Sequence, residues 1–223
     1  MNGFRVAHGH ERAEASMVEA FSKIPTAIIS DNLSRMVAAG PTVRPMHREG
    51  SLAGTAVTVK TRPGDNLLIH KAADMVQPGD VIVVDAGGDL TNALIGELII
   101  SHARTRGCVG FVVNGAVRDM DVISADTFPV YGAGVSHRGP YKDGPGEVNV
   151  PISLDGMIIE PGDIIIGDMD GVLCVPKADA ARVLKLARAQ EEKERSIQKA
   201  IQQSAWDRSW VDETLKAKGC AGV

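Results

Sequence analysis

The sequence predicts a mixed α/β domain and leaves the type of sheet open. Two patterns support this prediction. β-branched strand-like runs such as residues 81–84 alternate with helix-like stretches such as residues 98–106, and Pro-Gly pairs introduce several of the strands. With 44% hydrophobic but only 4% aromatic residues, the core must consist mainly of aliphatic side chains. The 223 residues suffice for one large domain with a substantial core.

The first third of the chain contains three helix patterns and one strand. Apolar spacing and stop signals predict helices over residues 13–23, 27–38 and 66–75, the second with Gly40-Pro41 as its stop. Asp65 is positioned to cap the third helix. Residues 52–61 alternate as a strand.

A short motif occurs twice. Residues 78–85 and 161–168 both read Pro-Gly-Asp, followed by a β-branched run that ends in Asp. Pro-Gly suits the two central positions of a type II turn, so each copy predicts a turn that leads into a strand. The copies are too few and too irregular to indicate a solenoid.

The remaining elements follow in order. The run after Gly87-Gly88 predicts a helix over residues 94–100 or slightly beyond. The Gly- and Pro-rich segment 137–151 predicts a long ordered loop with an edge strand. A long helix is expected from Ala178 to about Ser204, followed by Trp206 and Trp210 at helical spacing. Further strands are predicted at residues 109–113, 130–134, 147–152 and 172–175.

Charge and cysteine content exclude several classes of protein. The net charge is −4 and the basic residues are scattered, which argues against a nucleic-acid-binding face. Cys108, Cys174 and Cys220 have no metal-ligand spacing. Cys108 and Cys174 lie in apolar strand contexts, so small buried hydrophobes in a reducing compartment are expected. The N-terminus has no apolar signal segment, and the apolar runs are too short to span a membrane. We expect a soluble cytoplasmic protein.

The strongest functional pattern joins Glu97 to Arg118 and Asp119. A helix-like and then a strand-like stretch separates them, and this pair of elements returns the chain to its starting side. We therefore expect all three side chains to face one cleft. A carboxylate that binds a hard cation, beside a guanidinium that binds a carboxylate, suits a metal-bound 2-oxo acid.

Each of these residues also has a purely structural interpretation. Arg118 can be a surface residue, and Asp119 can pair with it in a turn, although neighbours in extended chain rarely pair well.

Other polar residues that could belong to a site also have structural explanations. Ser30-Asp31-Asn32 can cap a helix, and Asp168 and Asp170 are explained by turn chemistry. The histidines have no partner at metal-ligand spacing, so capping, packing or exposure is expected for His70, His102 and His137. His137, Arg138 and Lys142 can also form a pocket rim contributed across a subunit interface.

The pattern of Glu97, twenty intervening residues and then Arg118-Asp119 resembles the RraA-like family and especially its class II 4-hydroxy-4-methyl-2-oxoglutarate / 4-carboxy-4-hydroxy-2-oxoadipate aldolases. The resemblance runs from about Ile24 to Lys193 and includes residues 144–151 and 167–171. Two positions differ from the family pattern. Glu97 replaces the more frequent Asp, and Val122 stands where a second acid often follows.

The resemblance implies a specific fold and assembly. The fold would be an α/β/β sandwich resembling the phosphohistidine swivelling domain, with N-terminal helices and a long C-terminal helix. Residues 1–223 would form a single RraA-like domain, with a core at about 24–177 and a helical extension at about 178–220. The subunits would assemble as a homotrimer or homohexamer.

The resemblance also implies an activity. The chain would be a metal-dependent lyase that cleaves a 4-hydroxy-2-oxo di- or tricarboxylic acid to pyruvate and a second 2-oxo acid, with oxaloacetate decarboxylase side activity. Asp119 would hold Mg²⁺ or Mn²⁺, Arg118 would stabilise the enolate, and Glu97 would orient a water that transfers protons. The substrate would bind at Gly96, Leu98, Ile99 and Arg118.

Two other functions remain open. The family also contains non-catalytic regulators that bind and inhibit an RNA-degrading endonuclease. Methyl transfer to a quinone is a further function attached to the family, but no glycine-rich loop for the methyl donor follows a strand here. The retained Glu97, Arg118 and Asp119 favour the lyase.

Overall fold

The computed structural model describes residues 3–35 and 39–223, and its contacts divide the chain into two units, Met1–Ala187 and Arg188–Val223. The single domain expected over residues 1–223 stays a prediction. Within the described ranges, no helix is both long enough and apolar enough to cross a membrane.

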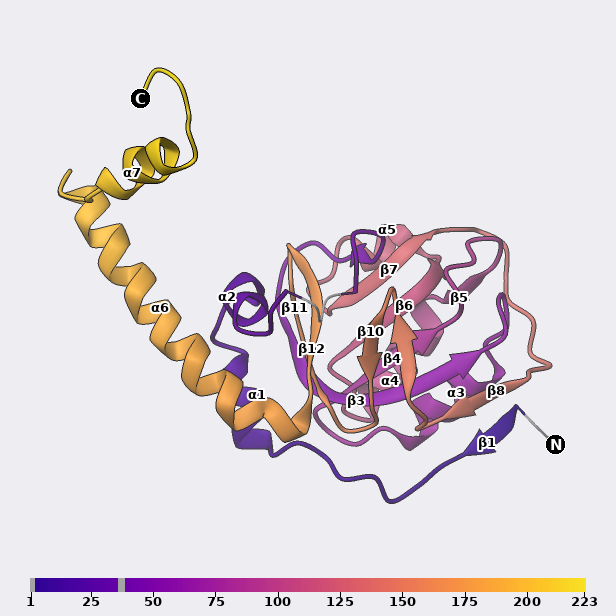
Figure 1. Cartoon of the computed structure of the whole chain (residues 1–223). Helices are drawn as coiled ribbons and strands as arrows, with labels where there is room; N and C mark the ends of the chain where they lie inside the picture. The colour runs from indigo at the N-terminus through magenta and orange to yellow at the C-terminus, as the bar shows by residue number, and fades with distance from the viewer. Residues whose placement is uncertain (1–2, 36–38) are drawn as a thin grey trace. The chain divides into compact units, whose positions relative to one another are not determined.

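The first unit is built from short helices and many strands (Figure 1). Its helices are α1 (Ala15–Phe21), α2 (Thr26–Asp31), α3 (Leu67–Met75), α4 (Glu97–Thr105), α5 (Met120–Ile123), the 3-10 helix η1 (Lys177–Asp179) and the start of α6 (Ala180–Gln202). Its strands are β1 (Phe4–Val6), β2 (Arg44–Pro45), β3 (Leu52–Thr61), β4 (Asp80–Asp85), β5 (Ala93–Ile95), β6 (Gly110–Val117), β7 (Val130–Val135), β8 (Gly146–Val148), β9 (Ile152–Leu154), β10 (Met157–Ile159), β11 (Ile164–Asp168) and β12 (Gly171–Val175).

The main sheet is mixed, which answers the question that the sequence left open. Its strand order is β1-β8-β3-β4-β6-β7-β2. The central strands β3, β4, β6 and β7 run parallel, whereas β8 and β11 pair antiparallel with β3. The predicted strands at residues 52–61, 80–85 and 164–168 are confirmed.

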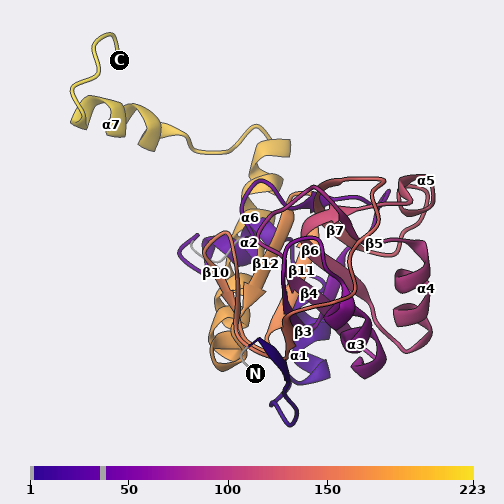
Figure 2. The same cartoon turned by 90° about the vertical axis from the view of Figure 1, so that its right-hand side faces the viewer.

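Strand β4 shows how the layers form, because its side chains alternate between two cores. Ile82 and Val84 pack with α3 and α4, whereas Val81 and Val83 pack with β9, β10 and β11. Figure 2 shows α3 and α4 on one side of the sheet and β10 on the other. The expected α/β/β sandwich is therefore confirmed.

A third hydrophobic core packs α1, α2 and the start of α6 against β11 and β12. Phe21 from α1, Ile29 from α2 and Val183 from α6 are fully buried against Ile164 and Leu173. These contacts fix the expected N-terminal helices and the start of the long helix against β11 and β12.

The repeated Pro-Gly-Asp motif makes the same turn twice. Gly79 and Gly162 have φ angles of +88° and +85°, which the second central position of a type II turn requires. The buried carboxylates of Asp80 and Asp163 each accept the backbone N–H three residues earlier, at 2.8 and 2.9 Å. The prediction from the repeat is confirmed.

The helix predicted over residues 27–38 is shorter than expected. Helix α2 ends at Asp31, and Ser34 and Arg35 adopt positive φ angles of 58° and 57°, which no helix can include. Residues 36–38 lie outside the described residues. Ser30 lies within α2 and does not cap it. Instead, Asp168 accepts both the N–H and the hydroxyl of Thr26 at the helix start.

Three other expectations need correction. Leu94 and Ile95 belong to a strand, because β5 pairs with β6 before α4 begins. The predicted edge strand β8 is an inner strand, because β1, which the sequence pattern missed, pairs along its other side. The segment 147–152 divides into β8 and β9.

The second unit contains the end of α6 and helix α7 (Ser209–Ala217). Trp210 lies on α7, whereas Trp206 precedes it, so the expected shared helix is wrong. The guanidinium of Arg208 lies 4.6 Å from the centre of the Trp206 ring. Both tryptophans are exposed, at 38% for Trp206 and 55% for Trp210.

Candidate functional site

The candidate site forms where β5 passes into α4 beside the end of β6. The N–H of Arg118 donates to the carbonyl of Ile95 at 3.1 Å, which places Arg118 next to Gly96, the residue before α4. The parallel pairing of β5 with β6 thus explains why Gly96 and Arg118, which are distant in sequence, meet.

Asp119 is oriented by an unusual backbone conformation. Its φ of 61° and ψ of 43° are left-handed, a region that Asp tolerates better than most residues. This geometry directs the carboxylate back to α4, where Oδ2 accepts the N–H of Glu97 at 2.9 Å. It also brings Oδ2 to 3.8 Å from Nε of Arg118, so these neighbours do pair, contrary to our expectation. Both side chains are over one-third exposed, which limits the strength of the pair.

Gly96 permits this close arrangement. Its φ of −160° is open to any residue, so space and not strain selects glycine. A Cβ atom at this position would lie 2.9 Å from Cγ of Arg118 and would also collide with the Asp119 carboxylate. Any larger residue would therefore displace the two charged side chains.

The N-terminus of α4 presents backbone donors next to Arg118. Within the described part of the chain, the N–H groups of Leu98 and Ile99 donate to no acceptor. Unpaired amides and the helix dipole together attract an anion. The side chain of Leu98 is 80% exposed and that of Ile99 is buried.

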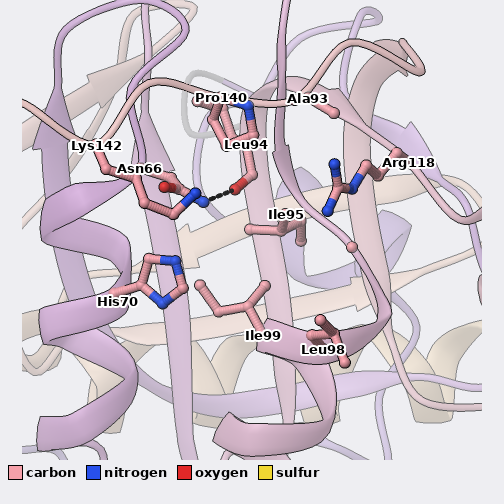
Figure 3. Close-up of a pocket in the computed structure, with 12 residues that line it drawn as sticks. Asn66, His70, Ala93, Leu94, Ile95, Leu98, Ile99, Arg118, Pro140 and Lys142 are labelled. Carbon is pink, nitrogen blue, oxygen red and sulfur yellow. Dashed lines mark hydrogen bonds between the residues drawn. The ribbon is translucent and has the colours of Figure 1, made fainter.

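These groups line a cavity of about 240 Å³ (Figure 3). Arg118 lies on one side, and His70 and Lys142 lie on the other, with Ile95 and Ile99 between them. The full lining consists of Asn66, His70, Ala93, Leu94, Ile95, Gly96, Leu98, Ile99, Arg118, Gly139, Pro140 and Lys142. Among these described lining residues, two are cationic at neutral pH and none is acidic, so the cavity favours anions.

Glu97 does not join Arg118 in this cavity. Its side chain, which is exposed, lines a separate hollow of about 210 Å³ with Ser101, Arg104 and Val122. Glu97 approaches the site through its backbone N–H, which holds Asp119. The single cleft expected for the three charged side chains is therefore not formed within one chain.

Asn66 contributes a polar group that the sequence pattern did not identify. Its Nδ2 donates to the carbonyl of Leu94 at 2.9 Å, which ties α3 to β5. Its Oδ1 is buried and has no hydrogen-bond partner among the described residues. An unpaired buried acceptor costs about 1–3 kcal/mol.

His70 is the second functional candidate missed from sequence. It lies one helical turn after Asn66, on the cavity side of α3. The spacing of four residues on a predicted helix could have indicated this shared face. Partial burial, and then the positive charge of Lys142, lower the pKa of His70, while Asp74 opposes the shift. Although His70 is exposed by surface area, this lowered pKa favours the neutral imidazole.

The pocket rim expected across a subunit interface stays a prediction. Within the single chain, Lys142 lines the cavity, whereas His137 and Arg138 are exposed and outside the described lining. His102 lies outside the cavity as well, with Nε2 at 2.9 Å from Asp74. The predicted turn role of Asp168 is confirmed by the N–H of Asp170, which donates to it at 2.9 Å.

The donor set at Asp119 fits a magnesium ion. One carboxylate oxygen accepts Glu97, which leaves the other oxygen for an ion. No cluster of three or more His, Cys, Asp or Glu side chains suited to a metal occurs within residues 3–35 and 39–223. Mg²⁺ tolerates such a site because it keeps several waters and takes further oxygens from a substrate.

Comparisons with known proteins identify the family of the chain. A family model for RraA-like proteins, described as Aldolase/RraA, matches residues 26–174. A protein of Halalkalibacterium halodurans named "Putative 4-hydroxy-4-methyl-2-oxoglutarate aldolase" is 40% identical over 190 residues, which cover 85% of this chain and 90% of that protein.

Two solved structures share the fold. An uncharacterised protein from Pseudomonas syringae pv. tomato has a TM-score of 0.79 and 28% identity, covering 88% of this chain and 93% of that one. The RNA-processing inhibitor RraA from Thermus thermophilis has a TM-score of 0.63 and 30% identity, covering 68% of this chain and 92% of that one.

Proposed function

Since the chain belongs to the RraA-like family, we propose that it is a divalent-metal-dependent lyase that cleaves a 4-hydroxy-2-oxo di- or tricarboxylic acid to pyruvate and a second 2-oxo acid. The observation that carries the proposal is the arrangement of Arg118, the free amides of Leu98 and Ile99, and Lys142 around one cavity. Arg118, the amides at the start of α4 and Lys142 thus offer three separate positive positions that can bind the negative groups of one substrate. The aldolase name of the Halalkalibacterium relative supports the same activity.

Each end of the substrate has a partner in this proposal. The amides of Leu98 and Ile99 bind the carboxylate next to the oxo group, because they lie unpaired at a helix N-terminus. Lys142, across the cavity, binds a second carboxylate. A simple monocarboxylate would leave Lys142 without a partner.

Asp119 is the residue that would hold Mg²⁺ or Mn²⁺ beside the oxo group. When bound, the ion supplies Lewis acidity for the negative charge that develops on the oxo oxygen. The Glu97 N–H keeps the Asp119 carboxylate in place. The Glu97 carboxylate, at the adjacent hollow, would orient water on the outer side of Asp119.

Arg118 stabilises the charge that forms as the carbon–carbon bond breaks. The electron pair of the C3–C4 bond moves into an enolate, and its negative charge develops at the C2 oxygen. A fixed guanidinium beside that oxygen favours the transition state more than the ground state. Loss of carbon dioxide from oxaloacetate yields the same enolate, so oxaloacetate decarboxylation is a proposed side activity.

The second candidate is a non-catalytic regulator of an RNA-degrading endonuclease. It is favoured by the likeness to the Thermus RNA-processing inhibitor, at 30% identity. A regulator of this kind would need neither a metal nor the cationic lining of the cavity.

Pyruvate release separates the two functions. The wild-type chain should release pyruvate from 4-hydroxy-4-methyl-2-oxoglutarate and from oxaloacetate with Mg²⁺, and lose both activities in EDTA. Asp119→Asn is the matched control, because an amide oxygen can still accept the Glu97 N–H while the negative charge is lost. If the wild-type chain in Mg²⁺ or Mn²⁺ releases no more pyruvate than this variant from either substrate, the lyase proposal is wrong.

A further inference from the structure

The proposed cleavage needs a base that removes the proton from the C4 hydroxyl. The cavity contains few groups that can do so. Among its described lining residues, Arg118 and Lys142 have side chains with hydrogen-bond donors and no acceptor, and Asn66 is a neutral amide. The other lining residues except His70 have no titratable side chain. His70 is thus the one lining side chain able to accept a proton.

The position of His70 suits this role. It lies across the cavity from Arg118, with Ile95 and Ile99 between them (Figure 3). A substrate whose oxo group lies at Arg118 extends its C4 end towards His70 and Lys142. Within the described chain, the histidine rings that form hydrogen bonds are those of His102, with Asp74, and His47, with Val130. The ring nitrogens of His70 are therefore available to a ligand.

The charged surroundings of His70 come from three elements. Lys142, on the loop after β7, and His102, on α4, lower its pKa, whereas Asp74, on α3, raises it. Partial burial is the largest cause, and the net direction is downward. The Asp74 carboxylate is also engaged by His102 at 2.9 Å, which leaves it a weaker partner for His70.

We propose that His70 is the general base of the cleavage and that it returns the same proton to the product enolate. This assignment rests on the proposed function. A ring nitrogen of His70 takes the hydroxyl proton, the oxygen–hydrogen electrons form the new C4 carbonyl, and the C3–C4 pair becomes the enolate. The imidazolium then protonates C3, which yields pyruvate and restores the neutral ring. No oxidant or reductant is required.

Two substrates distinguish a base from a merely structural residue. Oxaloacetate has no C4 hydroxyl, so its decarboxylation needs no base, and its enolate takes the C3 proton from water. For His70→Ala and His70→Gln, we expect cleavage of the hydroxy acid to fall about 10²–10⁴-fold, while decarboxylation changes less than about threefold. His8→Ala is the matched control, because it removes an exposed imidazole that neither lines the cavity nor is among the groups that shift the pKa of His70, and it should leave both reactions unchanged.

The pH profile provides a second readout. For wild type, kcat/KM of cleavage should fall with falling pH along a limb centred below the ordinary His pKa of about 6.5. This acidic limb of the kcat/KM profile should be absent in His70→Gln. In Lys142→Met the limb should move to higher pH, because Lys142 lowers the pKa of His70.

The outcomes separate the two proposals. Wild-type cleavage in His70→Gln, or equal losses in both reactions, overturns the assignment of His70 and leaves the lyase proposal intact. Absence of both activities in wild type overturns both proposals.

Discussion

The carboxylate of Asp119 accepts the backbone N–H of Glu97 at 2.9 Å, and this bond ties the end of β6 to the first residue of α4. The bond determines the direction of the proposed metal ligand. It also gives Glu97 a positioning role that does not depend on its side chain.

Asp119 should be essential for turnover but not for folding. Asp119→Asn keeps an acceptor for the Glu97 N–H and tolerates the left-handed backbone, yet it loses the charge that holds a cation. We expect pyruvate release to vanish while the melting temperature stays near that of wild type. Asp121→Asn, at an exposed neighbouring position, is the control. Wild-type turnover of Asp119→Asn in saturating Mg²⁺ would contradict this role.

Replacing Arg118 should slow the chemical step. Loss of a charge-stabilising donor costs about 10²–10³-fold in rate, so kcat of Arg118→Ala should fall by that factor. Arg118→Lys should remain poor, because an ammonium cannot make the bidentate contact of a guanidinium. Arg138→Ala, outside the described cavity lining, should behave as wild type. A normal kcat in Arg118→Ala would exclude Arg118 from the chemistry.

Gly96→Ala should impair activity through steric contact. The new Cβ would lie 2.9 Å from Cγ of Arg118 and collide with Asp119, so both side chains must move. Since the φ of −160° suits alanine and the charged side chains are partly exposed, the cost in stability should be small. Kinetic assays and thermal unfolding measure the two effects separately. A variant with full activity would show that the close approach at Gly96 is not required.

The exposed Trp206 and Trp210 lead us to propose assembly through the C-terminal unit. Exposed aromatic residues are typical of interfaces. Because the family resemblance implies trimers or pairs of trimers, we propose a homotrimer or homohexamer in which a neighbouring chain completes each site. Truncation after Gln203 should therefore lower both the oligomeric mass and the activity. Trp206→Ala with Trp210→Ala, in the full chain, tests the side chains alone. A fully active monomer in light scattering at the assay concentration would refute this prediction.

Much of the fold could be predicted from local patterns. The two Pro-Gly-Asp turns are an example, because Gly79 and Gly162 supply the positive φ and the Asp side chains close the turns within three residues. The strand over residues 52–61 and the start of the long C-terminal helix were likewise local properties. The proximity of Arg118 to the start of α4 could also be predicted, because a helix followed by a strand returns the chain to its starting side.

The elements that local sequence predicted wrongly depend on contacts with residues that are remote in sequence. Leu94 and Ile95 belong to a strand because β6 pairs with them, a contact that overrides their own preference. Strand β1 exists through pairing with β8, which lies more than 140 residues away. Helix α2 begins where Asp168, also remote in sequence, accepts the N–H of Thr26.

By itself the sequence determined the α/β character and the turns, and it pointed to Arg118 and Asp119 as the residues of the proposed site. Only the tertiary structure decided that Glu97 turns into a separate hollow while His70 and Lys142 join Arg118 in one cavity. The physical reason is that a helix start presents its backbone amides and its side chains in different directions. Whether the amides or the side chains of α4 face a cavity depends on where α3 and the loop after β7 lie. The local sequence around α4 does not encode the positions of these two neighbours.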